Sequence, residues 1–251
     1  DENQTSASRS FSITVQNDLP SNHFNTIIWT GTNSSQGRDF TNVGFEPGLV
    51  WSKLYNSAAA AHQLYDSVRD NEKALATNSS NAEYGPDAAG YIDGYLSNGF
   101  STVGGSAGNL YFNEPGKNYV AWNFKAGGAA VANTDGDINS QVSVNNSLGF
   151  SIVSWTSSST SSDTIGSGLD ERVEFLITKK YSGSRDWIVW HKDLPNNGYL
   201  SLNGTLGEST PNGNRATVTN DTTFIAQSTS GDLMIAYCFA SKPGFSKLGS
   251  Y

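Results

Sequence analysis

Cysteine, methionine, proline and charged residues are all scarce in this sequence. Its 251 residues include one Cys, one Met and seven Pro, and only 15% are Asp, Glu, Lys or Arg. Because Cys238 is the only cysteine, no disulfide can form within the chain, and its setting in "MIAYCFA" is typical of a buried strand. Helical proteins are usually richer in Glu, Lys and Arg, so the composition argues against a helical fold.

The sequence also lacks any cluster of Lys and Arg, and its formal net charge is −8. Nucleic-acid-binding surfaces need basic residues that follow the phosphate backbone, so we expect no nucleic acid partner. The same balance argues against binding to an anionic membrane surface. No apolar run is long enough to cross a bilayer, and no signal peptide is recognisable. We therefore expect no membrane insertion.

Residues 1–19 predict the last strand of a preceding immunoglobulin-like repeat. Phe11, Ile13 and Val15 alternate with polar residues, as in a half-buried strand. The chain has no initial Met, and we expect it to be a piece of a longer protein or to be processed from one.

Glycine and short aromatic or β-branched runs are abundant. There are 26 Gly, and 12% of the residues are aromatic. Such runs, separated by turns such as "PNNG", are typical of antiparallel β-proteins.

Several of these runs recur in the same order about half the chain later. Phe24 and Trp29 recur as Phe150 and Trp155, in both cases 126 positions on. The other matching pairs are "LVWSK" (49–53) with "FLITK" (175–179), "LATNSS" (75–80) with "LSLNGT" (200–205), and "YVAWNF" (119–124) with "MIAYCF" (234–239). This order predicts a tandem duplication. We expect an all-β protein with two antiparallel β-sandwiches of the jelly-roll or lectin-like type, over 20–128 and 148–251.

Residues 129–147 are small and polar, with a turn signal at "DG" and one short candidate strand, "QVSV". We interpret them as a linker between the two sandwiches. An excursion packed along the seam between the halves is the alternative.

Two runs carry apolar residues on both faces. In "HQLYDSV" (62–68), Leu64 and Tyr65 point to opposite sides, which predicts a strand between two layers. The alanine run before it would also allow a helical turn. In "YVAWNFK" (119–125), Trp122 lies on the face opposite Tyr119. We expect most tryptophans at such strand positions to be core residues.

Longer motifs resemble a repeated module of marine phage structural proteins, notably cyanophage tail fibres and related virion proteins, and of some large bacterial surface proteins. The motifs are "GFEPGLVWSK", "HQLYDSVR", "NYVAWNFKAGGAAVANTDGDI", "GFSIVSWT" and "YCFASKPGFSKLGSY". The resemblance covers nearly everything from Thr26 to Tyr251, although "GLDERVEFLITK" departs from it in the second copy. It implies a β-rich fold on a virion or cell surface. It supplies no activity and no catalytic residues.

The residues themselves predict no catalytic centre. The acidic residues of the first copy are not repeated in the second in any organised way: Asp66, Asp70, Glu72, Glu83, Asp87 and Asp93. His62 and His191 are expected to be structural residues of strands, and no His/Cys spacing suggests zinc. We therefore predict a protein that is not an enzyme.

One loop alternates oxygen ligands as a calcium site does. It comprises Asn133, Asp135, Asp137 and Asn139, with Gly136 permitting a tight bend. The bidentate Glu of a helical calcium hand is missing, so a polar turn is the favoured interpretation. Ca²⁺ is the one cofactor that the sequence leaves open.

Aromatic residues in loops are the candidates for glycan binding, because sugar C–H groups stack on exposed rings. The candidates are Tyr84, Tyr91, Tyr95, Tyr181 and Tyr199. Tyrosines at such places also cap the edges of sandwiches.

We accordingly expect a non-enzymatic structural and adhesion module of a phage tail fibre, in contact with host-surface glycan or protein. The expected partners also include other virion proteins and further copies of the chain, in a homo-oligomer that is frequently a trimer in fibres. The alternatives are a capsid-decoration, head-fibre or bacterial surface-filament repeat, and a glycan depolymerase acting through Asp66 or Glu83.

Overall fold

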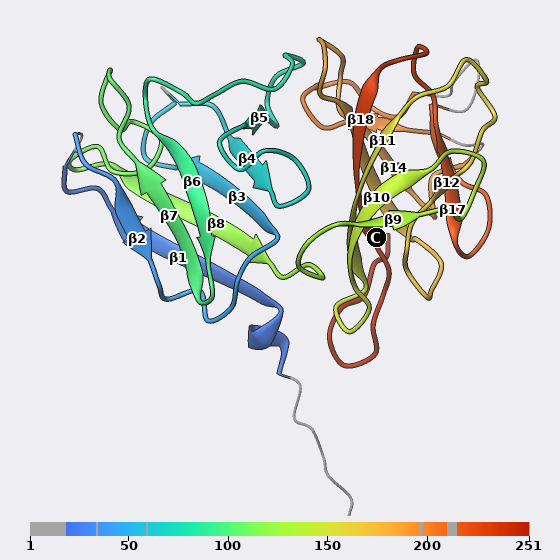
Figure 1. Ribbon diagram of the computed structural model, residues 1–251, viewed down its shortest axis with the longest axis horizontal. Helices are drawn as coiled ribbons and strands as arrows, with labels where there is room; N and C mark the ends of the chain where they lie inside the picture. The colour runs from blue at the N-terminus through green and yellow to red at the C-terminus, as the bar shows by residue number, and fades with distance from the viewer. Residues whose placement is uncertain (1–18, 34, 59, 196–197, 210–214, 251) are drawn as a thin grey trace, which may run out of the picture.

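The computed structural model describes residues 19–250 except 34, 59, 196–197 and 210–214. Apart from one turn of 3₁₀ helix, η1 (Pro20–Asn22), the regular elements of these residues are strands, which confirms the all-β prediction. In this part of the chain no helix has the length and apolar character needed to cross a bilayer. The strand predicted around Phe11 lies outside the described residues. We call residues 19–128 the first half and 129–250 the second half (Figure 1).

The first half contains two antiparallel sheets, with the strand orders β1-β8-β3-β4-β5 and β2-β7-β6. Its strands are β1 (Phe24–Thr30), β2 (Arg38–Phe40), β3 (Leu49–Leu54), β4 (Gln63–Asp66), β5 (Leu75–Ala76), β6 (Tyr91–Leu96), β7 (Gly99–Val103) and β8 (Asn118–Phe124). Side chains from both sheets enclose a hydrophobic core. In that core, Trp29 of β1 contacts Phe40 of β2 with a centroid distance of 4.5 Å.

The second half also contains two antiparallel sheets, with the orders β15-β14-β13-β18-β11-β10-β9 and β12-β17-β16. Its strands are β9 (Val131–Asn133), β10 (Ser140–Asn145), β11 (Phe150–Thr156), β12 (Ile165–Gly166), β13 (Phe175–Lys180), β14 (Ile188–His191), β15 (Leu200–Ser201), β16 (Ala216–Val218), β17 (Thr223–Ala226) and β18 (Leu233–Phe239). Its own core lies between these sheets. There, Trp155 of β11 contacts Phe224 of β17 at 5.6 Å.

The two halves share strand order and register. The run β1-β8-β3-β4-β5 corresponds to β11-β18-β13-β14-β15, and β2-β7-β6 corresponds to β12-β17-β16. Phe24 lies opposite Phe124 as Phe150 lies opposite Phe239. Trp29 and Trp155 each pack inside the core of their own half. This correspondence is consistent with a duplication, which stays a prediction.

The segment 129–147, predicted as a linker, carries two strands of the second large sheet. Here β9 pairs with β10, and β10 pairs with β11, so the sheet continues past the strands that both halves share. The predicted strand "QVSV" lies within β10. The segment pairs with the sheet because Val142 is apolar enough to enter the core of the second half, where it is 4% exposed.

Strand β4 lies between two layers, as predicted. Leu64 faces the second half, whereas Tyr65 enters the core of the first half. The described residues of the alanine run before β4 form no helix.

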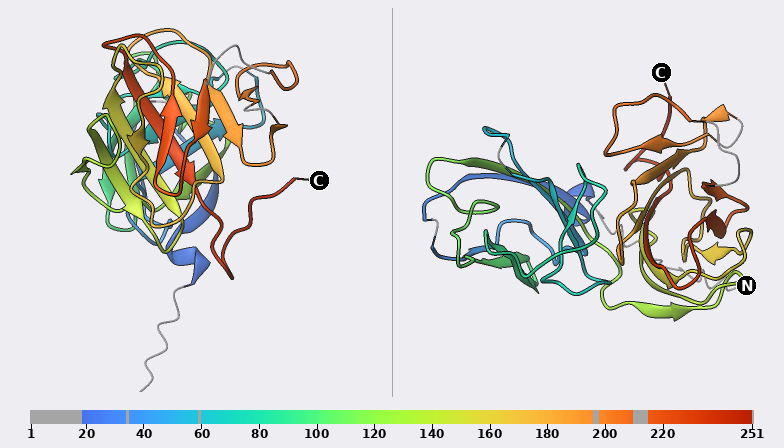
Figure 2. Two further views of the ribbon diagram at one scale, coloured as in Figure 1. Left: turned by 90° about the vertical axis from the view of Figure 1, so that its right-hand side faces the viewer. Right: turned by 90° about the horizontal axis from the view of Figure 1, so that it is seen from above.

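The outer faces of the two large sheets pack against each other and form a third hydrophobic cluster, which we call the junction. Figure 2 shows the two halves side by side. Aromatic rings cross from one half to the other, since Phe124 lies 5.4 Å from Phe150, which lies 4.9 Å from Phe239. The buried members of the junction are Leu49, Leu64, Leu75, Ala126, Leu148, Phe150, Ile152, Ile177, Trp187, Val189, Ile235 and Tyr237.

A buried ionic network reinforces the junction. Arg69 donates from Nε to Asp66 Oδ2 at 2.8 Å and from Nη1 to Glu83 Oε2 at 2.9 Å. From the second half, the hydroxyl of Tyr237 donates to the same Asp66 oxygen at 2.7 Å. The side chains of Asp66 and Arg69 are 0% and 2% exposed, so neither charge is solvated by bulk water.

Hydrogen bonds also join the end of β5 and the loop after it to the second half. The indole N–H of Trp187 donates to Ala76 O at 3.0 Å. The amine of Lys179, whose residue is 1% exposed, donates to the carbonyl oxygens of Ser80, Lys180 and Arg185 at 3.0, 2.8 and 2.7 Å. Burial lowers the pKa of Lys179 to about 8.

We predict that Arg69→Met destabilises the protein by about 3–5 kcal/mol, because it leaves the buried Asp66 charge without its cation. Urea unfolding of both proteins measures the difference. The matched control is Lys192→Met, which removes the more exposed ion pair with Glu174. That change should cost no more than about 1 kcal/mol. Equal effects of the two substitutions would contradict a structural role for the network.

The lowered pKa of Lys179 predicts a rise of stability with pH. Between pH 8 and 10.5 the folded protein has released this proton while the unfolded chain still binds it, so the free energy of unfolding increases with pH. Measured from pH 7.5 to 9.5, wild type should gain stability relative to Lys179→Met. The variant keeps every tyrosine and Cys238, so the difference isolates the lysine. If the free energies of unfolding of wild type and Lys179→Met changed in parallel with pH, the lowered pKa of Lys179 would be contradicted.

Candidate functional site

The outer face of the first large sheet is only partly covered by the second half. Along β8, buried Tyr119 and Ala121 alternate with half-buried Val120 and Trp122, which confirms the predicted division of this run between two faces. Trp122 lies opposite Trp51 of β3, and Trp51 lies opposite Leu64 of β4. Leu64 belongs to the junction, so the covered part of the face ends next to the two tryptophans.

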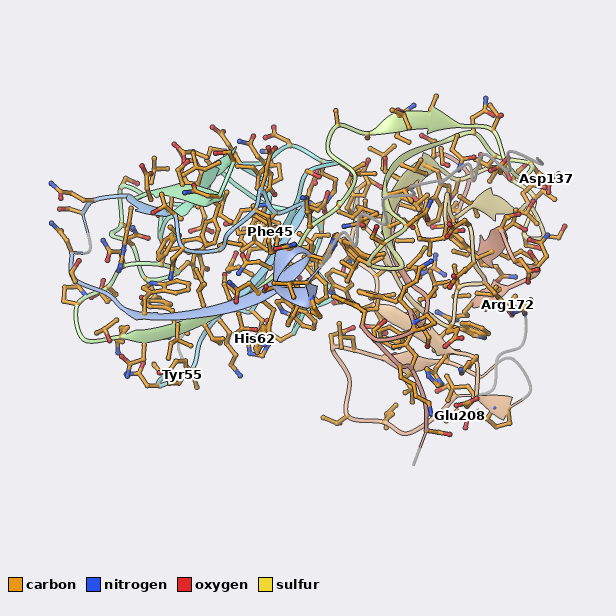
Figure 3. All side chains as sticks on the ribbon, turned by 90° about the horizontal axis from the view of Figure 1, so that it is seen from below. Phe45, Tyr55, His62, Asp137, Arg172 and Glu208 are labelled. Atoms are coloured by element: carbon orange, nitrogen blue, oxygen red, sulfur yellow. The ribbon has the colours of Figure 1, made fainter. Side chains whose placement is uncertain are left out.

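Beside the junction, this face forms an aromatic groove, which we call the Trp51–Trp122 groove. Its volume is about 410 Å³, and its lining residues are Trp51, Lys53, His62, Trp122 and Phe124. It continues into a second hollow of about 450 Å³, lined by Lys53, Tyr55, Ser57, Ala58, Ala60, His62 and Asn78. Figure 3 shows His62 and Tyr55 on the same side of the first half.

The two tryptophans are held at an angle. Their ring centroids are 5.9 Å apart and their planes are inclined by 65°. The indole N–H of Trp51 donates to Thr77 Oγ1 at 3.1 Å, which orients this ring. Two half-buried rings set at an angle offer a flat ligand both a face and an edge.

The polar groups of the groove and the adjoining hollow include one fixed cation, Lys53, and the side chains of His62, Tyr55, Ser57 and Asn78. The side-chain amine of Lys53 makes no hydrogen bond or ion pair with the described residues of the chain, while its backbone lies in the β3–β8 ladder. The pKa of His62 is lowered by burial and by the charge of Lys53. Asn78 Oδ1 accepts the backbone N–H of His62 at 3.1 Å, which leaves the amide nitrogen of Asn78 to donate. Among the residues that the structure describes, no carboxylate lines the groove or the adjoining hollow.

The corresponding face of the second half is closed. In the shared register, Trp51, Trp122 and Lys53 correspond to Ile177, Tyr237 and Lys179. All three of the latter are buried in the junction region. The same surface of the fold is thus a protein contact in the second half and a groove in the first.

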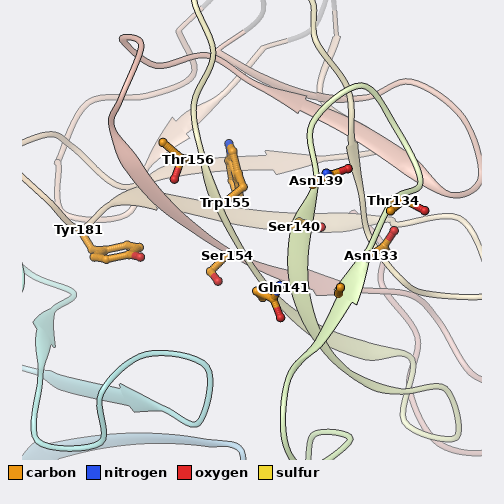
Figure 4. Close-up of a pocket in the computed structure, with 10 residues that line it drawn as sticks. Asn133, Thr134, Asn139, Ser140, Gln141, Ser154, Trp155, Thr156 and Tyr181 are labelled. Carbon is orange, nitrogen blue, oxygen red and sulfur yellow. The ribbon is translucent and has the colours of Figure 1, made fainter.

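A polar hollow of about 320 Å³ lies on the second half and gathers three of the predicted site residues (Figure 4). They are Asn133, Asn139 and Tyr181, and they lie around Gln141 of β10 and Ser154 of β11.

The loop predicted to bind calcium makes hydrogen bonds to the protein. Asn133 Oδ1 accepts the N–H of Asp135 at 2.6 Å. Asp137 Oδ2 accepts from the backbone N–H and hydroxyl of Thr164, which lowers the pKa of Asp137. No cluster of three or more His, Cys, Asp or Glu occurs in the described part of the chain. The loop is therefore tied to residue 164, and a role for Asn133, Asp135, Asp137 and Asn139 in Ca²⁺ binding stays a prediction.

The five tyrosines predicted to bind ligand are half-buried and belong to three hydrophobic clusters. Tyr84, Tyr91 and Tyr95 pack on the core of the first half, Tyr199 packs on that of the second, and Tyr181 joins the junction. They do not gather at one site. Their rings contribute to packing, as the alternative interpretation of loop tyrosines expects.

Sequence reasoning missed Trp51 and Trp122 as candidates. Strand tryptophans were expected in the core, and Trp29 and Trp155 do lie there. The available signal was the apolar character of both faces of "YVAWNFK", which requires a second layer or an exposed aromatic surface. Cys238 is buried, as predicted, and burial raises the pKa of its thiol to about 12.

A family described as a domain of unknown function (DUF7483) matches residues 19–251. No curated protein and no solved structure matched the chain. The match covers both halves, including the groove, the junction and the polar hollow. The chain therefore belongs to the DUF7483 family.

Proposed function

We propose that the chain is a non-catalytic binding module that holds a host-surface glycan in the Trp51–Trp122 groove. The observation that carries the proposal is the pair of half-buried tryptophans, 5.9 Å apart, on the partly open face of a rigid sheet. A sugar ring has apolar C–H faces and polar hydroxyl edges, so it combines ring stacking with hydrogen bonds at its rim.

The groove offers both an apolar surface for stacking and hydrogen-bond donors at its rim. Trp51, Trp122 and Phe124 supply apolar area, and Lys53 and Asn78 supply donors at its edge. Strands β3 and β8 pair along six residues and carry the tryptophans, so the rings need little ordering when a ligand binds.

The proposed setting is a phage appendage such as a tail fibre. The motifs that resemble tail-fibre proteins support this location, and both tryptophans lie within those motifs. Association with further copies of the chain and with other virion proteins belongs to the same proposal.

The contacts of Asp66 and Glu83 argue against the depolymerase alternative. A glycosidase needs two carboxyl groups that both reach the substrate. Asp66 is fully buried and both carboxylates bind Arg69, so this pair serves the junction.

We predict that Trp122→Ala weakens glycan binding about 5- to 150-fold, since a ligand ring stacked on an aromatic side chain, measured for nucleobases, contributes roughly 1–3 kcal/mol. A glycan array identifies the ligand, and calorimetry then measures its affinity. Leu206→Ala, at a position that is 82% exposed, is the matched control and should bind as wild type does.

Trp122→Phe keeps an aromatic ring and should retain intermediate affinity, which separates stacking from loss of folding. Thermal unfolding of each variant checks the fold. Absence of binding across the array, or full binding by Trp122→Ala, would contradict the proposal and favour a spacer without a ligand.

A further inference from the structure

The charge of the groove is positive, whereas the net charge of the chain is negative. The formal net charge is −8, with 23 acidic and 15 basic residues. The ionisable residues that line the groove and its extension are Lys53, His62 and Tyr55, and no Asp or Glu is among them. The groove thus carries a positive charge with no acidic residue among its described lining residues, although the protein as a whole is negatively charged. Such a groove favours an anionic ligand.

The hydrogen-bonding groups point to the same ligand chemistry. Neutral sugar hydroxyls act as both donors and acceptors. Here Lys53 can only donate, and the side-chain oxygen of Asn78 already accepts the backbone N–H of His62. The one charged group of the groove is thus a donor without acceptor capacity, which suits a ligand group that carries negative charge on acceptor oxygens.

The second half shows what a lysine does at this register position. Lys179, the counterpart of Lys53, donates to Ser80 O of the first half and to Lys180 O and Arg185 O of its own half. Lys53 has the same place on its sheet and no oxygen acceptor among the described residues. An oxygen-rich ligand would supply to Lys53 what the protein supplies to Lys179.

We infer that the groove binds a polyuronate, an acidic polysaccharide whose sugar ring stacks on Trp122 while its carboxylate accepts hydrogen bonds from Lys53 and from His62 or Asn78. This inference rests on the proposed glycan-binding function. A carboxylate is planar and lies at the edge of the sugar ring, so the apolar C–H face stays free to stack. Charge-assisted hydrogen bonds to it are stronger than those to a neutral hydroxyl.

The test compares oligogalacturonate with its methyl ester, which has the same rings but no charge. Wild type should bind the acid at least about tenfold more tightly than the ester, the difference that one charge-assisted hydrogen bond makes. Lys53→Met should lower affinity for the acid to that for the ester, and Lys53→Arg should restore much of it. Lys192→Met, far along the chain, should leave both affinities unchanged. Trp122→Ala should weaken both ligands.

Salt and pH give independent measurements. Raising NaCl from 50 to 500 mM should weaken binding of the acid and leave the ester unaffected. His62 is neutral at pH 7 because its pKa lies below the usual value. Each decrease of pH below 7.5 protonates more of this ring, so binding of the acid should strengthen as the pH falls in wild type, and the gain should be lost in His62→Gln.

The outcomes separate the two proposals. Equal affinity for acid and ester overturns the polyuronate inference and leaves glycan binding intact. Tighter binding of dextran sulfate than of oligogalacturonate overturns the assignment of a carboxylate. If neither these ligands nor any glycan of the array binds, the proposed function itself is contradicted.

Discussion

The burial of two sheet faces against each other determines how the rest of the molecule is arranged. Each half closes its own core, yet each also carries apolar side chains on the outer face of its large sheet. Such faces are unfavourable in water, and packing them together removes them from solvent. The junction is polar as well as apolar, because Asp66 accepts hydrogen bonds there from both Tyr237 and Arg69.

The two halves contribute unequally to this contact, and the Trp51–Trp122 groove lies where the first half is left uncovered. The second half buries the equivalents of Trp51, Trp122 and Lys53 completely, whereas the first half leaves these three residues half-exposed beside the junction. Equivalent surfaces of the two halves thus form a protein contact in the second half and a partly open groove in the first.

Much of the fold was predictable because it depends on local periodicity. The alternation in "YVAWNFK" and the opposite faces of Leu64 and Tyr65 are properties of a strand, and the spacing of the repeated runs follows from strand pairing. The role of 129–147 was not predictable, since β9 and β10 gain their partners only from a sheet formed elsewhere in the chain. The site was missed for the same reason. Trp122 and Tyr237 occupy equivalent positions, and only the packing of the halves decides which is covered.

The most direct test of this account follows the indole N–H signals of the six tryptophans by NMR during titration with the tightest-binding glycan. The account predicts that the signals of Trp122 and Trp51 move first and furthest, while Trp29 and Trp155, inside the two cores, do not move. Larger shifts at Trp155, which borders the polar hollow, or saturating binding without a shift at Trp122, would contradict it.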